Sequence, residues 1–350
     1  MNSQKRFLPN PSNPLLLIVI GIAGIFVLLA VHPANACAQD VHVRVSPTST
    51  GTTASLNDFP TIQMALDHAP DPGPTGRLYL HIAPGIYHER VFVTQNRTRT
   101  TLLGTGTRPE DVVITASQNA KSAGGTFFSS TVEVTASDFI ADNLTFENAA
   151  GNTGQAVAIT VRSDRAIFKH CRFLGDQDTL FADFGRQYYV NSYIQGGVDF
   201  IFGNAAAVFD NTEIHIIRPG YLTAQSRVSP DQNTGYVFLH CRITAEDLLG
   251  KSFFLGRPWR PFSRVVFLSS QMPASLNPQG WSPWKPSVTL DNAFYAERDS
   301  QGPGADPTSR SSRITGSHQL TAAEAAPFAP EIFLSGSDHW NPLAEAAKQP

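Results

Sequence analysis

A seven-residue pattern of apolar and polar positions recurs five times along the middle of the chain. Its first and seventh positions are apolar, its second is always Phe or Tyr, its fourth is His, Asn or Ser, and its fifth is Cys, Ser or Thr. Short β-branched and aromatic runs divided by polar turn residues are typical of strands. The copies lie at residues 167–173, 188–194, 208–214, 237–243 and 266–272, with a weaker copy at 140–146.

The spacing of the copies predicts the architecture. The aromatic position falls at residues 168, 189, 209, 238 and 267, in steps of 21, 20, 29 and 29. A repeat of about 20 residues or more indicates a solenoid whose coils stack on one core. We therefore expect an all-β fold, a single right-handed parallel β-helix. The extra residues of the two 29-residue steps are expected to form loops on the binding face. A two-sheet sandwich is the alternative, but sandwiches seldom repeat one pattern in register.

Short capping helices are expected at the two ends of this β-rich region. Residues 62–69 have apolar side chains at helical spacing after Pro60, and Thr321 with Glu324 forms a capping box before an Ala-rich segment. Almost nothing between them has a helical pattern.

The repeat also bears on the cysteines. Cys171 and Cys241 hold the same position three coils apart. Stacked strands lie about 4.8 Å apart, so the two Cα atoms are expected about 14 Å apart. A disulfide needs less than about 7 Å. We expect both thiols to be free, buried and structural.

Two aspartates are superposed by the same period. Asp178 follows Cys171 by seven residues and Asp199 follows Ser192 by seven, which predicts Cα atoms about 5 Å apart on adjacent coils. Carboxylates this close repel when both are ionised, so one pKa should be raised and the other lowered. The pair would then divide into an acid and a nucleophile or base. Two exposed turn residues are the alternative, and the apolar residues that follow each Asp favour catalysis.

Other side chains could assist this pair. Gln177 precedes Asp178 and Gln155 falls one coil earlier, and amides of this kind can donate to a developing oxyanion. Arg257 lies in a long insert, where its forked guanidinium could hold Asp199 ionised. Each residue alone also has an ordinary structural explanation. Aromatic rings that could stack on sugar faces are those of Trp259, Phe181 and Phe202.

Composition narrows the function classes. The chain has 350 residues, 41% of them hydrophobic and 16% charged, so it can bury a sizeable core. Its formal net charge is −3 and no basic block stands out, so no nucleic-acid partner is expected. Patterns for a serine-hydrolase elbow or a His- or Cys-based metal site do not occur. Neither a cofactor nor a metal is expected.

The beginning of the sequence is expected to direct export. A basic start precedes the unbroken apolar run 15–31, and residues 34–36 have the small-x-small pattern of a cleavage site. We expect a signal peptide at 1–36 and a β-helix domain at 37–345, hence a secreted or periplasmic protein. The alternatives are a retained membrane anchor through the apolar run or a lipidated Cys37.

Five motifs together resemble the pectin methylesterase (pectinesterase) family of carbohydrate esterases. They follow the family order and similar spacing between about residues 41 and 342. The resemblance implies the β-helix fold, an external cleft, and release of methanol from methyl-esterified galacturonate in pectin, without metal or cofactor. We expect a monomer whose partner is pectin. The motifs are Gly85-Ile86-Tyr87-His88-Glu89, Gln155-Ala156-Val157-Ala158, Gln177-Asp178-Thr179-Leu180, Asp199-Phe200-Ile201-Phe202-Gly203 and Leu255-Gly256-Arg257-Pro258-Trp259.

The resemblance also implies a division of labour. Asp199 is the nucleophile on the ester carbonyl, and Asp178 first protonates departing methanol and then activates water. The remaining implied roles are oxyanion stabilisation by Gln177 and Gln155, orientation of Asp199 by Arg257, and sugar binding by Trp259.

Two positions depart from the family pattern. Asp176 stands where many plant relatives carry an aromatic residue, and Phe181 stands where Tyr is common. Both positions are expected near sugar. We expect the extra acid of Asp176 to disfavour demethylated, anionic pectin. Equal rates on low- and high-ester pectin, unchanged in Asp176→Asn, would contradict this.

Three other functions fit parts of the pattern. Another pectin-active solenoid, a lyase or a polygalacturonase, would form unsaturated products or new reducing ends. An esterase or thioesterase of the same fold would act on a non-pectin ester. A non-catalytic wall-binding lipoprotein would be expected to have lost one of Asp178, Asp199 and Arg257, and all three are present.

Overall fold

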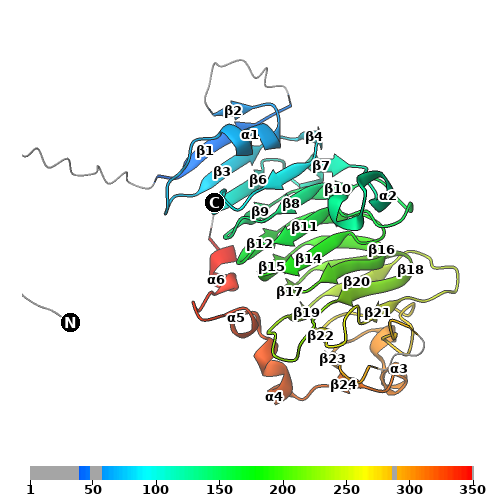
Figure 1. The fold of residues 1–350 in the computed structure, drawn as a ribbon. Coiled ribbons are helices and arrows are strands. Elements are labelled where there is room, and N and C mark those ends of the chain that lie inside the picture. Colours follow the sequence, from blue (N-terminus) through cyan, green and yellow to red (C-terminus); the bar gives the residue numbers. More distant parts are fainter. Residues whose placement is uncertain (1–38, 48–56, 286–289, 349–350) are drawn as a thin grey trace, which may run out of the picture. The chain divides into compact units, whose positions relative to one another are not determined.

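The chain folds as a right-handed parallel β-helix, as its repeat predicts (Figure 1). The computed structural model describes residues 39–47, 57–285 and 290–348; the expected signal peptide and Cys37 lie outside them. Ala38–Pro350 forms one compact unit, and the boundaries 37–345 stay a prediction. No helix in the described part of the chain is both long and apolar enough to cross a membrane.

The first sheet takes one strand from each successive coil, and every pair in it is parallel. Its strands are β2 (Asp58–Phe59), β1 (Val41–Val45), β3 (Leu78–Ile82), β6 (Thr100–Gly104), β9 (Ile140–Asp142), β12 (Ala166–Lys169), β15 (Arg186–Val190), β17 (Ala206–Asp210), β19 (Gly235–Leu239), β22 (Arg264–Leu268), β23 (Phe294–Arg298) and β24 (Ser317–Gln319).

The other strands form two ladders that the long strands β16 (Tyr193–Gly203) and β18 (Glu213–Gln225) join into a second sheet. One ladder consists of β4 (Gly85–His88), β7 (Val112–Ala116), β10 (Thr145–Asn148), β13 (Arg172–Leu174) and β20 (Arg242–Ala245), and the other of β5 (Val91–Val93), β8 (Val132–Val134), β11 (Ile159–Arg162), β14 (Leu180–Phe184) and β21 (Phe254–Gly256).

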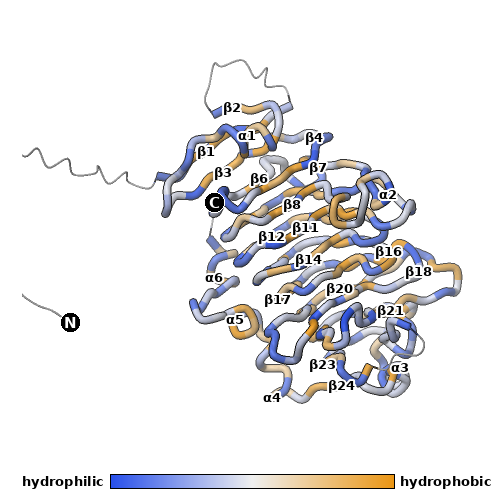
Figure 2. Tube along the Cα trace, viewed as in Figure 1, coloured by the Kyte–Doolittle hydropathy of each residue, from blue (hydrophilic) through white to orange (hydrophobic). Residues whose placement is uncertain are grey.

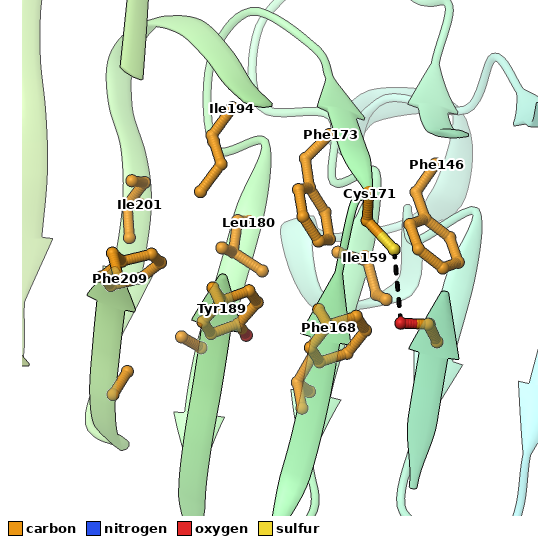
Figure 3. Close-up of a cluster of buried hydrophobic side chains, with 14 of the residues drawn as sticks. Phe146, Ile159, Phe168, Cys171, Phe173, Leu180, Tyr189, Ile194, Ile201 and Phe209 are labelled. Carbon is orange, nitrogen blue, oxygen red and sulfur yellow. Dashed lines mark hydrogen bonds between the residues drawn. The ribbon is translucent and has the colours of Figure 1, made fainter. Parts of the chain in front are cut away.

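The repeated aromatic position builds the interior. Phe168 pairs with Tyr189, and the rings at 209, 238 and 267 continue the same column in register. Successive rings are stacked with centroids 4.4 to 4.9 Å apart (Figure 3). Such pairs contribute about 0.5–1.5 kcal/mol each beyond their area burial. Figure 2 shows apolar and polar residues alternating along the stacked coils.

The polar fourth position turns the chain from the first sheet to the second. His170, Asn191, Asn211, His240 and Ser269 all have left-handed backbones, with φ between 46° and 53°. Asn and His adopt this conformation more readily than most residues other than Gly. The repeat therefore encodes a turn at each coil.

The two cysteines in the described part of the chain are free and buried, as expected. The thiol of Cys171 donates to Ala141 O at 3.5 Å (Figure 3), and its backbone N–H donates to Ser192 Oγ on the next coil at 3.1 Å. Burial raises the pKa of Cys241 to about 12. Both thiols are therefore protonated and structural.

The N-terminal helix forms where apolar spacing places it, but it begins later than the position of Pro60 suggests. Helix α1 (Ile62–His68) is capped by Thr61, whose hydroxyl accepts the Met64 N–H. Glu89 accepts from the first two helical N–H groups, so part of the Gly85–Glu89 motif is structural. Three short segments along the coils are η1 (Pro109–Asp111), α2 (Ala120–Ala123) and η2 (Thr126–Phe128).

The C-terminal helices lie along the first sheet, whereas the sequence indicated caps at the ends. The capping box of Thr321 is confirmed, but the helices that follow it pack on the outward apolar stripe of Val208, Val237 and Val266. Each of these coils leaves one such side chain on the outer face, and the stripe needs a cover. Figure 1 shows α5 and α6 beside the strands of this sheet. The helices after the capping box are α4 (Ala322–Ala325), η4 (Ala326–Phe328), α5 (Pro330–Phe333) and α6 (Pro342–Ala346). Two short helices precede it and do not join the stripe, η3 (Pro303–Ala305) and α3 (Pro307–Ser311).

Candidate active site

Asp178 and Asp199 lie side by side on adjacent coils, as the period predicts. The Asp178 N–H donates to Val198 O at 3.1 Å, and two residues later Leu180 pairs with Ile201. Both aspartates therefore hold the same place, at the point where the chain enters the ladder of β14 and the second half of β16.

Both carboxylates stand on left-handed backbone. Asp178 has φ 66° and Asp199 has φ 51°. This conformation costs a residue with a Cβ about 1–2 kcal/mol, and Asp and Asn tolerate it best. The same conformation turns the chain at the fourth position of each repeat copy, so both aspartates lie at a recurring kind of turn.

Arg257 holds Asp199 with the predicted fork. Its Nε donates to Asp199 Oδ1 at 2.9 Å and its Nη2 donates to Oδ2 at 2.6 Å. The guanidinium lies over the rings of Tyr221 and Trp284, at 4.0 and 4.3 Å from their centroids. The side chains of Asp199 and Arg257 are only 8% and 21% exposed, so both charges are largely removed from water.

The two carboxyls differ in what stabilises their charge. Burial raises the pKa of Asp178 well above its usual value, and the charge of Asp199 raises it further. Burial also raises the pKa of Asp199, although the hydrogen bonds and charge of Arg257 oppose that rise. Both pKa values are therefore raised, whereas the sequence predicted that one would be lowered, because burial outweighs the guanidinium. Asp178 is therefore the better proton donor and Asp199 the better anion.

The two glutamines reach the same edge of the coils. Gln155 and Gln177 form an isolated parallel bridge, and Gln177 bridges in turn to Val198 beside Asp199. Gln155 is exposed and Gln177 is half-buried. The two glutamines thus lie in one row across adjacent coils, and this row is one residue before the row of the carboxylates. An oxyanion formed at the carboxylates would need hydrogen-bond donors here.

The predicted aromatic residues form a small cluster apart from the main core. Phe181 and Phe202 pair in register with rings stacked at 4.5 Å, and Trp259 packs against them with Trp284. Phe127, 43% exposed, stacks on Phe181 at 5.1 Å. Phe181 and Phe202 are only 3% and 4% exposed, so their faces are not open to sugar as the sequence predicted, and they form an apolar border beside the carboxylates instead.

Asp176 does not present a free charge. It is only 5% exposed, and its Oδ1 accepts a hydrogen bond from Arg218 Nε at 2.5 Å. The expected repulsion of anionic pectin therefore lacks its physical source, because a buried, paired carboxylate is compensated by its partner. Sequence reasoning missed Arg218, whose place on the lengthened strand β18 no repeat position marks.

Tyr221, Trp284 and Phe127 were also missed by sequence reasoning. Tyr221 could have been found from register, because it pairs with Val198 beside Asp199. Trp284 and Phe127 lie outside the repeat, and no spacing links them to the carboxylates. In the residues that the structure describes, no group of three or more His, Cys, Asp or Glu is placed to hold a metal ion.

The raised pKa of Asp178 has a consequence for stability. The unfolded chain releases this proton near the ordinary value, whereas the folded chain keeps it to higher pH, so wild type loses stability as pH rises through that window. We expect Asp178→Asn to be more stable than wild type at pH 7, with the gap closing as the pH falls to the ordinary titration range of an aspartate. Chemical unfolding across pH measures this.

Asp199→Asn is the matched control for that comparison. It removes the partner of a buried guanidinium, and it should therefore destabilise the fold at pH 7. Equal stability of wild type and Asp178→Asn at pH 7 would show that the Asp178 carboxyl is not held protonated by the fold.

Comparisons with known proteins find relatives over most of the chain. The family model described as Pectinesterase matches residues 50–337. Pectinesterase 31 of Arabidopsis thaliana is 40% identical over 303 residues, which cover 83% of this chain and 92% of the relative. The solved pectin methylesterase from carrot has a TM-score of 0.80 and 34% identity, covering 89% of this chain and 97% of its own.

A second solved structure is that of a pectin methylesterase in complex with a hexasaccharide. It has a TM-score of 0.70 and 28% identity, covering 86% of this chain and 98% of its own. Sequence and fold therefore agree over nearly the whole of the described region. The chain belongs to the pectinesterase family.

Proposed function

We propose that the chain hydrolyses methyl esters of galacturonate residues in pectin, with Asp199 as the nucleophile and Asp178 as the acid and then the base. The observation that carries the proposal is the stacked carboxylate pair, of which only Asp199 is forked to a guanidinium. Membership of the pectinesterase family supports the substrate class.

In the first half-reaction the Asp199 carboxylate attacks the ester carbonyl. The carbonyl electron pair moves to oxygen, and the amides of Gln177 and Gln155 donate to the resulting oxyanion. The oxyanion then collapses, the bond to the methoxy oxygen breaks, and Asp178 gives that oxygen its proton. Methanol leaves, and the galacturonate carbonyl is joined to Asp199 as an acyl-enzyme.

In the second half-reaction Asp178 is ionised and accepts a proton from water. The hydroxide equivalent attacks the acyl carbonyl, the bond to Asp199 breaks, and the galacturonate carboxyl is released. Asp199 regains its charge beside Arg257, and Asp178 is again the acid. Water and ester are consumed, and one methanol and one acid are formed.

The aromatic cluster supports the choice of a sugar polymer as substrate. Trp259, Phe181 and Phe202 line one border of the pair, and aromatic faces stack on the apolar faces of sugar rings. The hexasaccharide complex of a related pectin methylesterase is consistent with an extended binding site. We propose that Trp259 and the exposed ring of Phe127 contact the substrate, and that the buried rings of Phe181 and Phe202 support them.

The remaining proposals concern the protein outside its site. We propose that it acts as a monomer on pectin without binding nucleic acid. We also propose that residues 1–36 direct export, with retention through residues 15–31 or a lipid on Cys37 as alternatives. N-terminal sequencing of the mature protein distinguishes these three.

Product analysis tests the proposed reaction. Wild type incubated with methyl-esterified pectin should release methanol, with neither new reducing ends nor unsaturated sugars. New reducing ends would indicate a glycosidase and unsaturated products a lyase. Absence of methanol from pectin, with hydrolysis of another ester, would favour the non-pectin alternative.

A further inference from the structure

A second buried ion pair lies beside the carboxylates, and the reaction above does not use it. Asp176 stands two residues before Asp178, and its carboxylate is bound by Arg218 Nε at 2.5 Å. Arg218 belongs to β18, two coils further along the solenoid. The Asp176–Arg218 pair therefore passes across the coil that carries Asp199.

Gly197, on the intervening coil, makes room for this pair. A Cβ at Gly197 would lie 2.6 Å from Asp176 Oδ1 and 2.5 Å from Arg218 Cγ, closer than real contacts allow. Gly197 has no positive φ. A glycine is therefore required here by the lack of space for a side chain, and not by the backbone conformation. A Cβ at Gly220 would likewise lie 2.1 Å from Gly197 O. The three coils approach closely where the pair crosses.

The segment that carries Asp178 is hydrogen-bonded through its backbone to both neighbouring coils. From the preceding coil, Ala156 N donates to Gln177 O at 3.0 Å and Ala158 N donates to Thr179 O at 2.9 Å. Residues 175–179 lie between β13 and β14 and belong to no strand. Two backbone hydrogen bonds tie them to the next coil, Gly197 N to Asp176 O at 2.9 Å and Asp178 N to Val198 O at 3.1 Å. Within the described residues no group donates a hydrogen bond to the Asp178 carboxyl. The direction of that carboxyl therefore depends on this backbone, to which the Asp176–Arg218 pair adds a side-chain connection that crosses two coils.

Asp199 provides the contrast. Its carboxylate is oriented directly by the forked guanidinium of Arg257, whereas Asp178 has no such partner. We propose that the Asp176–Arg218 pair is a positioning device that aims the general acid Asp178 at the leaving methoxy oxygen. This inference rests on the proposed function, because it assumes that Asp178 gives a proton to that oxygen.

Three variants test the pair, namely Asp176→Ala, Arg218→Ala and the double variant. The double variant leaves no unpaired buried charge, so it folds even if a single variant does not. We expect kcat on methyl-esterified pectin to fall about 10- to 100-fold, because small displacements of a catalytic group cost this much. KM should change less than about threefold, and the double variant should be no slower than either single variant.

Changing the leaving group of the ester distinguishes a misplaced general acid from a general loss of active-site structure. An alcohol that is more acidic than methanol departs with less help from an acid. With trifluoroethyl-esterified oligogalacturonides the deficit of Asp176→Ala and of the double variant should shrink to a few-fold. Asp178→Asn should show the same dependence on leaving group.

The Glu213–Arg242 pair supplies a matched control. It also joins β18 to a neighbouring strand through an arginine and a carboxylate, and it lies in the other ladder, away from the carboxylates. Arg242→Ala should leave kcat unchanged on both esters. Equal deficits of Asp176→Ala on the two esters, or a normal kcat in the double variant, would overturn the inference. Failure of wild type to release methanol would instead overturn the proposed function.

Discussion

Asp199→Asn is expected to lower kcat for methanol release by about 10⁴-fold or more, because it removes the nucleophile. Asn is the informative replacement because it tolerates the left-handed backbone at φ 51° as Asp does. It also keeps the side-chain volume beside Arg257. The measurement is methanol released from esterified pectin, with folding checked by circular dichroism at the assay temperature.

Binding should survive this substitution. The aromatic border and the Asp178 turn do not depend on the Asp199 charge, so affinity for the polymer should change only slightly. Methanol release near the wild-type rate in a folded Asp199→Asn protein would show that another group attacks the ester.

Arg257→Gln is expected to lower kcat about 10²- to 10³-fold and to move the acidic limb of the pH–rate profile toward higher pH. Activity needs Asp199 ionised, and Arg257 is what opposes the rise that burial causes in the pKa of Asp199. Without the guanidinium that pKa rises further, so the nucleophile is protonated over a wider acidic range. The measurement is kcat/KM across pH.

Arg257→Lys separates charge from geometry in the same experiment. An ammonium restores much of the positive charge but cannot form the fork that aligns both carboxylate oxygens. The acidic limb of the pH–rate profile of Arg257→Lys should therefore lie closer to that of wild type than the limb of Arg257→Gln does, while kcat stays low. A Lys variant with wild-type kcat would show that orientation by the fork is unimportant.

The sequence was sufficient for the coils and for the carboxylate pair because both follow from one winding period. The stacked rings from Phe168 to Phe267 and the register of Asp178 with Asp199 use the same seven-residue offsets. Arg257 was proposed as the partner of Asp199 from its place in a long insert and from its motif, but no position of the repeat fixed the contact. Its contact with Asp199 depends on how the segment after β21 folds back.

What the sequence could not provide lies where the period is broken. Trp284 and Phe127 reach the site from segments outside the repeat, and Arg218 comes from a strand that is longer than its neighbours. The charge of Asp176 misled the prediction because composition does not reveal that a buried partner compensates it. The sequence predicted the C-terminal helices at an end of the solenoid. Their capping box indicates where a helix begins, but it does not indicate which apolar surface the helix covers.

The central claim is that two superposed carboxyls hold different protonation states, and carbon NMR of Asp-labelled protein tests it most directly. Spectra of wild type, Asp178→Asn and Asp199→Asn across pH would assign the two signals by their disappearance. We predict that the Asp178 signal titrates well above the ordinary range of an aspartate, while Asp199 is ionised at lower pH than Asp178. Two signals that both titrate in the ordinary range, or the reverse order, would contradict the account.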